Sequence, residues 1–203
     1  MSIVIGICGG SASGKSTFTT QLKEYLGSSK CAILSLDNYY IDFTGENSGS
    51  SVINYDQPNS IEMDLLASHI NSLIVGKSIN SPLYDYKTHK RLSQFKKIVP
   101  ADYLLVEGLF LFNMPQFSAL FNVRVFINTS SYVRFIRRIR RDMEQRDRGL
   151  YSIIKQYAQQ VRPMYRKYVE PNSALAHIII AGEIPFSGQI PDVLQLLSKS
   201  TGT

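Results

Sequence analysis

The segment from Gly9 to Ser16, Gly-Gly-Ser-Ala-Ser-Gly-Lys-Ser, matches the pattern G-x-x-x-x-G-K-[ST] and constrains the fold more than any other part of the chain. The preceding residues, Ser2 to Cys8, form a short apolar run rich in β-branched side chains, which predicts a buried parallel strand. The residues that follow, Thr17 to Leu26, carry apolar side chains at helical spacing. A strand, a glycine-rich turn and a helix in this order form a phosphate-binding loop. The segment therefore predicts binding of a nucleoside triphosphate.

The chemistry of this loop follows from its glycines, which let consecutive backbone N–H groups point into one cavity at the positive end of the next helix. We expect Lys15 to reach the outer phosphates and to act in catalysis, and the Ser16 hydroxyl to bind Mg²⁺. The residues expected to contact the nucleotide are Gly9, Gly10, Ser11, Ala12, Ser13, Gly14, Lys15, Ser16 and Thr17.

Length and composition indicate one globular domain spanning residues 1–203, since 44% of the residues are hydrophobic and 19% are charged. No run of about 18 apolar residues suggests a membrane span, and the N-terminus lacks the pattern of a secretion signal. Cys8 and Cys31 fall in predicted strands and are expected to be reduced. These features predict a cytoplasmic protein with no membrane partner.

The net charge of +6 raises the question of nucleic-acid binding, so its distribution matters. Residues 131–148 contain seven arginines and three acidic residues, and account for +4 of that charge. A nucleic-acid surface would need basic residues spread along the chain. A charge run is usually a solvated helix face, which is the alternative here. Because a phosphate-binding loop is present, we expect these arginines to form a lid over a triphosphate, in residues 131–149, and we expect no nucleic-acid partner.

The remaining pattern predicts strands that alternate with helices, which is typical of an α/β fold with a five-stranded parallel sheet flanked by helices. Further strands are expected at Cys31–Leu36, Asp102–Val106, Val123–Ile127 and Leu175–Ala181, and helices at Tyr132–Met143, Tyr151–Val169 and Pro191–Ser198. Another helix is expected after Pro58, with Ile61, Leu65, Leu66, Leu73 and Ile74 on its buried side. Residues 81–99 interrupt the alternation and predict a β-hairpin inserted over the acceptor site, and residues 44–51 predict a mobile loop.

Two carboxylates directly follow predicted strands, namely Asp37 and Glu107. Ligands of parallel sheets bind beyond the carboxyl ends of the strands, so both side chains should meet the phosphate-binding loop in one cleft. We expect Asp37 to be the general base that accepts a hydroxyl proton, the alternative being a helix cap or loop carboxylate. We expect Glu107 to hold Mg²⁺ directly or through water, with a capping role as the alternative.

Asp56 and His89 are candidates for contact with an acceptor. One carboxylate can accept hydrogen bonds from both vicinal hydroxyls of a ribose, although Asp56 also precedes a proline-started helix that it could cap. The stretch 82–91 offers aromatic faces for a base, together with His89 for its polar edge. A structural or solvated histidine is the alternative.

Taken together, the chain resembles the uridine kinases (uridine–cytidine kinases) of the phosphoribulokinase/uridine kinase group of P-loop kinases. The matching segments cover roughly residues 3–182 in the family's order: GGSASGKST, LSLDNYY, NYDQP, SPLYDYKTHKR, LLVEGLFLF, VRFIRRIRRDMEQRDRG and QYAQQVRPMYRKYVEP. The hairpin segment and the arginine-rich segment are much more specific than the loop motif.

The resemblance implies a P-loop NTPase fold and transfer of the γ-phosphate of ATP or GTP, with Mg²⁺, to the 5′-hydroxyl of uridine or cytidine in pyrimidine salvage. It implies that Asp37 is the base and that Arg141 and Arg146 close over the phosphates. The residues that it implies for nucleoside binding are Tyr40, Asp56, Tyr84, Tyr86, His89, Arg138, Arg148 and Gln156. It also implies a homo-oligomer, commonly a tetramer.

One departure from the family pattern is an acid between two lid arginines, Arg146-Asp147-Arg148, where Arg-Gly-Arg is usual. We expect Asp147 to compete for Arg148 while the lid is open. Two other functions stay open: a kinase of the same group for a sugar phosphate, pantothenate or nicotinamide riboside, and a non-kinase P-loop ATPase that drives partner or nucleic-acid binding. Aromatic hairpin residues argue against a sugar phosphate, which needs cations. Uridine and cytidine stay open as acceptors.

Overall fold

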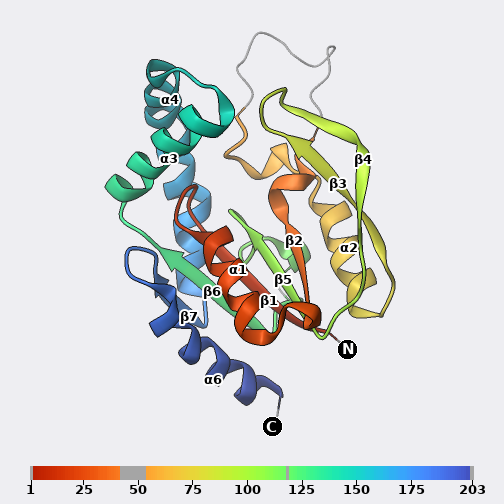
Figure 1. The fold of residues 1–203 in the computed structure, drawn as a ribbon. Helices are drawn as coiled ribbons and strands as arrows, with labels where there is room; N and C mark the ends of the chain where they lie inside the picture. Colours follow the sequence, from red (N-terminus) through yellow and green to blue (C-terminus); the bar gives the residue numbers. More distant parts are fainter. Residues whose placement is uncertain (1, 42–53, 118, 202–203) are drawn as a thin grey trace.

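A five-stranded parallel sheet forms the centre of the molecule (Figure 1). The computed structural model describes residues 2–41, 54–117 and 119–201. The strand order is β2-β5-β1-β6-β7, with β1 at Ile3–Gly9, β2 at Cys31–Ser35, β5 at Tyr103–Gly108, β6 at Val123–Asn128 and β7 at Ile178–Ala181. The predicted α/β architecture is therefore confirmed.

Helices cover both faces of this sheet. Because successive side chains of a strand point to opposite faces, Ile5 and Ile7 of β1 pack on one side while Val4 and Cys8 pack on the other. The first side is covered by α1 (Lys15–Leu26) and α6 (Ile190–Thr201). The second side is covered by α2 (Met63–Ile74) and by apolar residues of the 109–121 and 165–176 segments.

The predicted helix after Pro58 begins later than expected. Pro58–Ser60 forms a single 3₁₀ turn, and α2 starts at Met63. The reason is that Ile61 is extended and forms an antiparallel bridge with Tyr40. The buried residues of α2 are Met63, Leu66, Ile70 and Leu73, whereas Leu65 and Ile74 are only half-buried.

The predicted helix at 151–169 is helical but not uniform. It consists of α4 (Leu150–Gln156), a π-helical turn (Tyr157–Val161), α5 (Arg162–Met164) and a second π-helical turn (Tyr165–Val169). Pro163 lacks the N–H that a regular α-helix would use there, which explains the irregular hydrogen bonding. A 3₁₀ helix, Glu170–Leu175, occupies the predicted start of the last strand.

The turn of a β-hairpin and helix α3 (Ser131–Arg146) extend beyond the carboxyl ends of the strands (Figure 1). An antiparallel hairpin, β3 (Ile79–Asp85) and β4 (Lys90–Ile98), lies on one side. It begins two residues before the region 81–99 in which a hairpin was predicted. Helix α3, followed by α4, lies on the other side. The loop expected at 44–51 falls outside the described residues. Within the described ranges, no helix is both long and apolar enough to cross a membrane.

Candidate active site

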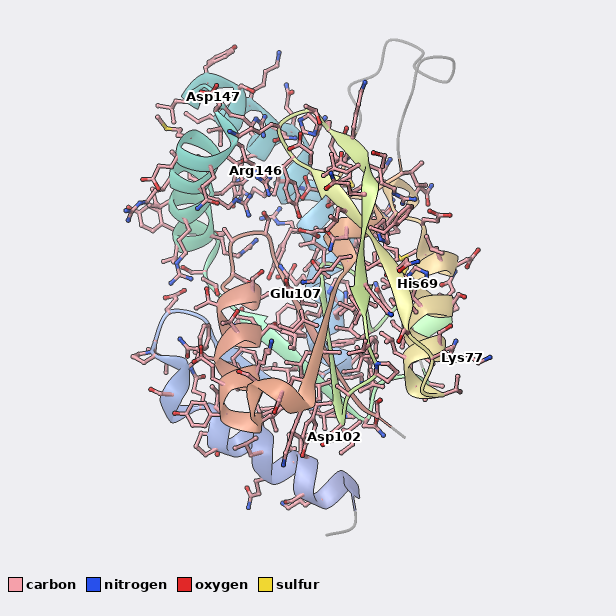
Figure 2. All side chains as sticks on the ribbon, turned by 45° about the vertical axis from the view of Figure 1, so that its right-hand side comes forward. His69, Lys77, Asp102, Glu107, Arg146 and Asp147 are labelled. Carbon is pink, nitrogen blue, oxygen red and sulfur yellow. The ribbon has the colours of Figure 1, made fainter. Side chains whose placement is uncertain are left out.

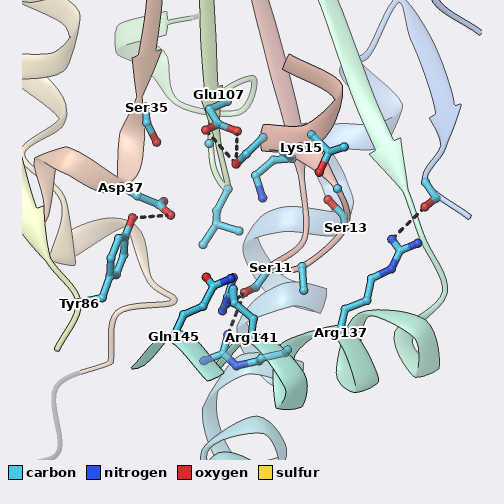
Figure 3. Close-up of a pocket in the computed structure, with 18 of the residues that line it drawn as sticks. Ser11, Ser13, Lys15, Ser35, Asp37, Tyr86, Glu107, Arg137, Arg141 and Gln145 are labelled. Carbon is cyan, nitrogen blue, oxygen red and sulfur yellow. Dashed lines mark hydrogen bonds between the residues drawn. The ribbon is translucent and has the colours of Figure 1, made fainter. Parts of the chain in front are cut away.

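A cavity of about 860 Å³ opens at the carboxyl edge of the sheet, between the phosphate-binding loop, the hairpin and α3 (Figure 3). It brings together most of the predicted site residues: Ser11, Ala12, Ser13, Gly14, Lys15, Ser16, Thr17, Asp37, Tyr40, Asp56, Tyr84, Tyr86, His89, Glu107, Arg138, Arg141, Arg146, Arg148 and Gln156. Gly9 and Gly10 do not line it, because both are buried behind the loop.

A left-handed glycine joins the phosphate-binding loop to the helix that follows it. Gly14 is left-handed, with a φ of 102°, and directly precedes α1. The Lys15 Nζ donates a hydrogen bond to the Gly10 carbonyl at 3.0 Å, so the ammonium group lies over the loop. Burial lowers the pKa of Lys15, while the carboxylates of Asp37 and Glu107 act in the opposite direction.

The back of the loop is fixed by Thr129, which the sequence analysis did not assign, and by Arg134, which it counted among the arginines of the lid. Thr129, just after β6, donates from Oγ1 to the Ser13 carbonyl at 2.8 Å. Arg134 is only 4% exposed, donates from Nε to the Thr129 carbonyl, and places its guanidinium 3.6 Å from the centre of the Tyr165 ring. An added Cβ at Gly10 would meet the Arg134 side chain at 2.5 Å. Arg134 therefore supports the loop rather than facing the cavity.

Ser16 and Glu107 form the candidate magnesium site. The Ser16 hydroxyl lies 3.0 and 2.9 Å from the two carboxylate oxygens of Glu107. Burial raises the pKa of Glu107, and Lys15 opposes this rise. Hydroxyl and carboxylate oxygens are the hard donors that Mg²⁺ prefers. Among the described residues, no group of three or more His, Cys, Asp and Glu side chains is arranged so that it could hold a metal ion.

Asp37 follows β2 in a short 3₁₀ helix, Leu36–Tyr39, and is not its capping residue, which is Ser35. The Tyr86 hydroxyl donates to Asp37 Oδ2 at 3.3 Å, and Figure 3 shows this pair across the cavity from Lys15. The Arg146 guanidinium lies 4.2 Å from the centre of the Tyr86 ring. Burial raises the pKa of Tyr86 above its ordinary value, which keeps the phenol protonated as a donor at neutral pH.

Aromatic rings line the part of the cavity next to the hairpin. Tyr40 contacts both Tyr55 and Tyr84, with ring centroids 5.4 and 5.2 Å apart, and Tyr84 contacts Tyr86. His89 stacks on Tyr55 with centroids 5.0 Å apart and an angle of 15° between the planes. Tyr55 was not among the predicted site residues, although it immediately precedes Asp56.

His89 and Asp56 differ in how far they are buried. His89 stays exposed at the hairpin turn, yet desolvation of its stacked ring lowers its pKa, and Arg148 and Arg146 lower it further. Asp56 is only 8% exposed, and burial raises its pKa while Arg138 lowers it. Asp56 is not the cap of the turn at Pro58, whose capping residue is Gln57. Asp56 lines the cavity together with Arg138.

The arginines of α3 reach both ends of the cavity. Arg138 donates to the Ser11 hydroxyl at 2.9 Å and to Gln156 Oε1 at 3.0 Å. Arg148 donates to the same Gln156 oxygen at 2.6 Å. Arg141 Nη2 lies 3.5 Å from the Ser11 hydroxyl (Figure 3). Arg138 thus connects the phosphate-binding loop to Gln156 of α4.

The expected competition between Asp147 and Arg148 stays a prediction, and the structure shows another partner for Arg148. Arg148 pairs with Asp142, with its Nη1 3.4 Å from the carboxylate, and the sequence analysis did not single out Asp142. Asp147 caps the end of α3 with a φ of 54° (Figure 2). This left-handed conformation favours glycine, which accounts for the Arg-Gly-Arg pattern of the family that the chain resembles.

At the opposite end, residues 182–186 line the cavity beside the start of α1. Arg137 donates to the Gly182 carbonyl at 2.9 Å (Figure 3), and the Glu183 carboxylate accepts from the Ser130 N–H at 2.6 Å. The sequence analysis counted Arg137 only among the arginines of the predicted lid. The structure places it beside the phosphate-binding loop, where it lines the cavity together with residues 182–186.

Comparison with known proteins agrees with this arrangement. Residues 4–183 match the model of the Phosphoribulokinase / Uridine kinase family. The chain is 41% identical to a uridine kinase of Alkaliphilus metalliredigens over 179 residues, which cover 88% of this chain and 86% of that protein. It is 38% identical to one of Chloroflexus aurantiacus over 181 residues, covering 89% and 87%. The solved phosphoribulokinase of Rhodobacter spheroides shares the fold, with a TM-score of 0.66 at 14% identity, over 89% of this chain and 70% of that one.

Proposed function

The chain belongs to the phosphoribulokinase/uridine kinase family, and we propose that it is a nucleoside kinase that phosphorylates the 5′-hydroxyl of uridine and cytidine. The observation that carries this proposal is the composition of one cavity. Its floor is a phosphate-binding loop, and its far end combines the buried carboxylate of Asp56 with stacked aromatic rings and His89. A nucleoside needs both features, a carboxylate for the ribose hydroxyls and flat faces for the base.

Asp37 is the group suited to accept the proton of the 5′-hydroxyl. Its carboxylate lies at the carboxyl end of β2, between the loop and the aromatic pocket, where the acceptor must meet the donor phosphate. The hydrogen bond from Tyr86 orients this carboxylate and leaves its other oxygen for the substrate. Tyr40, Tyr84 and Tyr86 then hold the nucleoside at a fixed distance from the base, which is how positioning contributes to phosphoryl transfer.

Lys15, Arg141 and Arg146 are suited to the transferred phosphoryl group. Charge builds up on phosphate oxygens in the transition state, and fixed cations in a site shielded from water stabilise it. Ser16 and Glu107 would hold Mg²⁺, which when bound neutralises the outer phosphates of ATP or GTP. The residues at 182–186 and Arg137 would surround the donor base.

Release of ADP tests this proposal directly. The purified protein is supplied with ATP and Mg²⁺, and with uridine, cytidine, ribulose 5-phosphate, pantothenate or no acceptor. We expect turnover with uridine and cytidine only. Preference for ribulose 5-phosphate or pantothenate would assign a different acceptor class, and equal turnover without acceptor would indicate an ATPase.

The same protein preparation tests two further expectations. A homo-oligomer, with a tetramer as the commonest arrangement in the family, stays a prediction that size-exclusion chromatography with light scattering decides. A cytoplasmic location also stays a prediction, and it agrees with the need for a supply of ATP or GTP.

A further inference from the structure

Asp142 places a fully buried carboxylate, 0% exposed, among the arginines of the lid. Its Oδ1 lies 2.8 Å from Arg141 Nη2 and 3.6 Å from Arg146 Nη1. Its Oδ2 lies 3.5 Å from Arg138 Nε and 3.4 Å from Arg148 Nη1. One carboxylate therefore contacts four guanidinium groups, two on each oxygen.

Together the four arginines reach both the phosphate-binding loop, where Arg138 donates to Ser11, and the aromatic pocket, where Arg146 lies on the Tyr86 ring. The arginines on Oδ1, Arg141 and Arg146, are those proposed to bind phosphate. The arginines on Oδ2, Arg138 and Arg148, both donate to Gln156 Oε1 on the nucleoside side. We propose that Asp142 is a positioning residue that holds both pairs of arginines, and so supports nucleotide and nucleoside binding together. This inference rests on the proposed nucleoside kinase function.

Electrostatics explains why a buried anion is needed at this point. Four cations converge within a few ångströms, and with no anion between them they would repel one another and move toward water. The side chains of these arginines are only 6–28% exposed, so solvent screens the repulsion weakly. A carboxylate at the centre keeps each guanidinium in a single orientation before any ligand binds.

The backbone of Asp142 contributes to the same arrangement. Its carbonyl accepts hydrogen bonds from the N–H groups of Asp147 and Arg148, the latter at 3.1 Å. These bonds end α3 and turn the chain back, so that Arg148 returns to the carboxylate of Asp142. Figure 2 shows Asp147 at this turn and Arg146 beside it.

The same helix supplies a matched control. Arg140 and Glu144 form an ion pair with 2.9 Å between Nε and Oε1, but their side chains are 79% and 56% exposed. Exposed pairs of this kind contribute little. The substitution Glu144→Gln therefore removes one negative charge from α3 without touching the cavity, and Asp142→Asn removes one from the centre of the lid.

The test measures steady-state kinetics with ATP and uridine, together with thermal unfolding. For Asp142→Asn we expect both KM values to rise about tenfold or more, since a misplaced guanidinium loses charge-assisted hydrogen bonds to its ligand. For Glu144→Gln we expect both KM values to match the wild type. A purely structural role would lower the melting temperature and the fraction of active enzyme, but would leave both KM values unchanged.

Two additions ensure that every outcome decides the question. If Asp142→Asn does not fold, Asp142→Glu keeps the charge, shifts the carboxylate by one methylene, and should raise both KM values as well. Calorimetric titration with ATP alone tests the effect of Asp142 on nucleotide binding, even if uridine proves not to be the acceptor. Unchanged ATP affinity and unchanged KM values in the folded variants would overturn the role of Asp142, whereas an inactive wild type would overturn only the proposed reaction.

Discussion

The guanidinium of Arg91, on β4, donates from Nη2 to the backbone carbonyl of Tyr40 at 3.0 Å. The same nitrogen lies 3.2 Å from the Tyr39 carbonyl, and Nη1 pairs with Glu62 at 2.7 Å. One side chain thus joins the hairpin to the segment that carries Asp37. The position of the aromatic pocket relative to the proposed base depends on this connection.

Replacing Arg91 with lysine should therefore weaken nucleoside binding and leave nucleotide binding intact. A single ammonium group cannot serve three acceptors in the geometry of a guanidinium. We expect the KM for uridine to rise about three- to tenfold, the equivalent of one or two lost hydrogen bonds, and the KM for ATP to stay constant. Lys96→Gln, an exposed change on the same strand, is the control. A parallel rise in both KM values would mean that Arg91 supports the whole fold.

Asp37→Asn keeps the shape of the side chain and removes its basic site. We expect kcat to fall about 100-fold or more with little change in the KM for uridine, as is typical of a lost general base. Tyr86→Phe removes the hydroxyl that orients Asp37 but keeps the ring, so its effect on kcat should be smaller. A nearly normal kcat for Asp37→Asn would transfer the base role to another carboxylate, with Glu107 the next to test.

His89→Ala should weaken uridine binding by about 1 kcal/mol or more, through the loss of one hydrogen bond and of the stacked ring. ATP binding should not change, because His89 lies at the hairpin end of the cavity. Calorimetric titration with each ligand separately measures both effects. An unchanged affinity for uridine would make His89 a surface residue of the hairpin without contact to the substrate.

The pH dependence of uridine affinity follows from the direction of two pKa shifts. The pKa of His89 is lowered from 6.5, so the imidazole ring is neutral above pH 6.5. The contribution of the neutral ring to uridine binding is lost as the pH falls through the lowered pKa. Asp56, whose pKa is raised from 3.8 by burial, also gains a proton on the acid side. We expect constant uridine affinity from about pH 6.5 to 8 and a decline below that range. In His89→Ala only the decline due to Asp56 should remain.

Asp147→Gly should stabilise the protein by up to about 1 kcal/mol, because glycine adopts the left-handed conformation at φ 54° without strain. The KM for uridine should stay the same, since Arg148 pairs with Asp142 rather than with Asp147. Thermal unfolding and kinetics measure the two effects, with Asp147→Ala as the control that keeps a Cβ. Tighter binding of uridine in Asp147→Gly would instead support competition between Asp147 and the ligand for Arg148.

Most of the fold could be predicted from the sequence because its signals are local. The phosphate-binding loop is a contiguous motif flanked by its own strand and helix, and strands that alternate with helices have few ways to pack. The predicted helix boundaries were less accurate at Pro58 and around Pro163. At Pro58, a long-range bridge between Tyr40 and Ile61 keeps the backbone extended and delays the start of the helix. Around Pro163, the missing N–H of the proline makes the helix irregular.

The residue types of the site were determined by the sequence alone, since a Gly-rich loop, carboxylates after strands and a run of arginines each have a characteristic chemistry. Only the tertiary structure decided which of those residues contact one another and which of them line the cavity. The guanidinium of Arg134 lies on the Tyr165 ring rather than in the cavity, and His89 stacks on Tyr55, which is distant from it in the sequence. The carboxylate of Asp142 contacts Arg148 because the chain reverses at the left-handed residue Asp147. Such contacts depend on burial and on the meeting of distant segments, which no local pattern encodes.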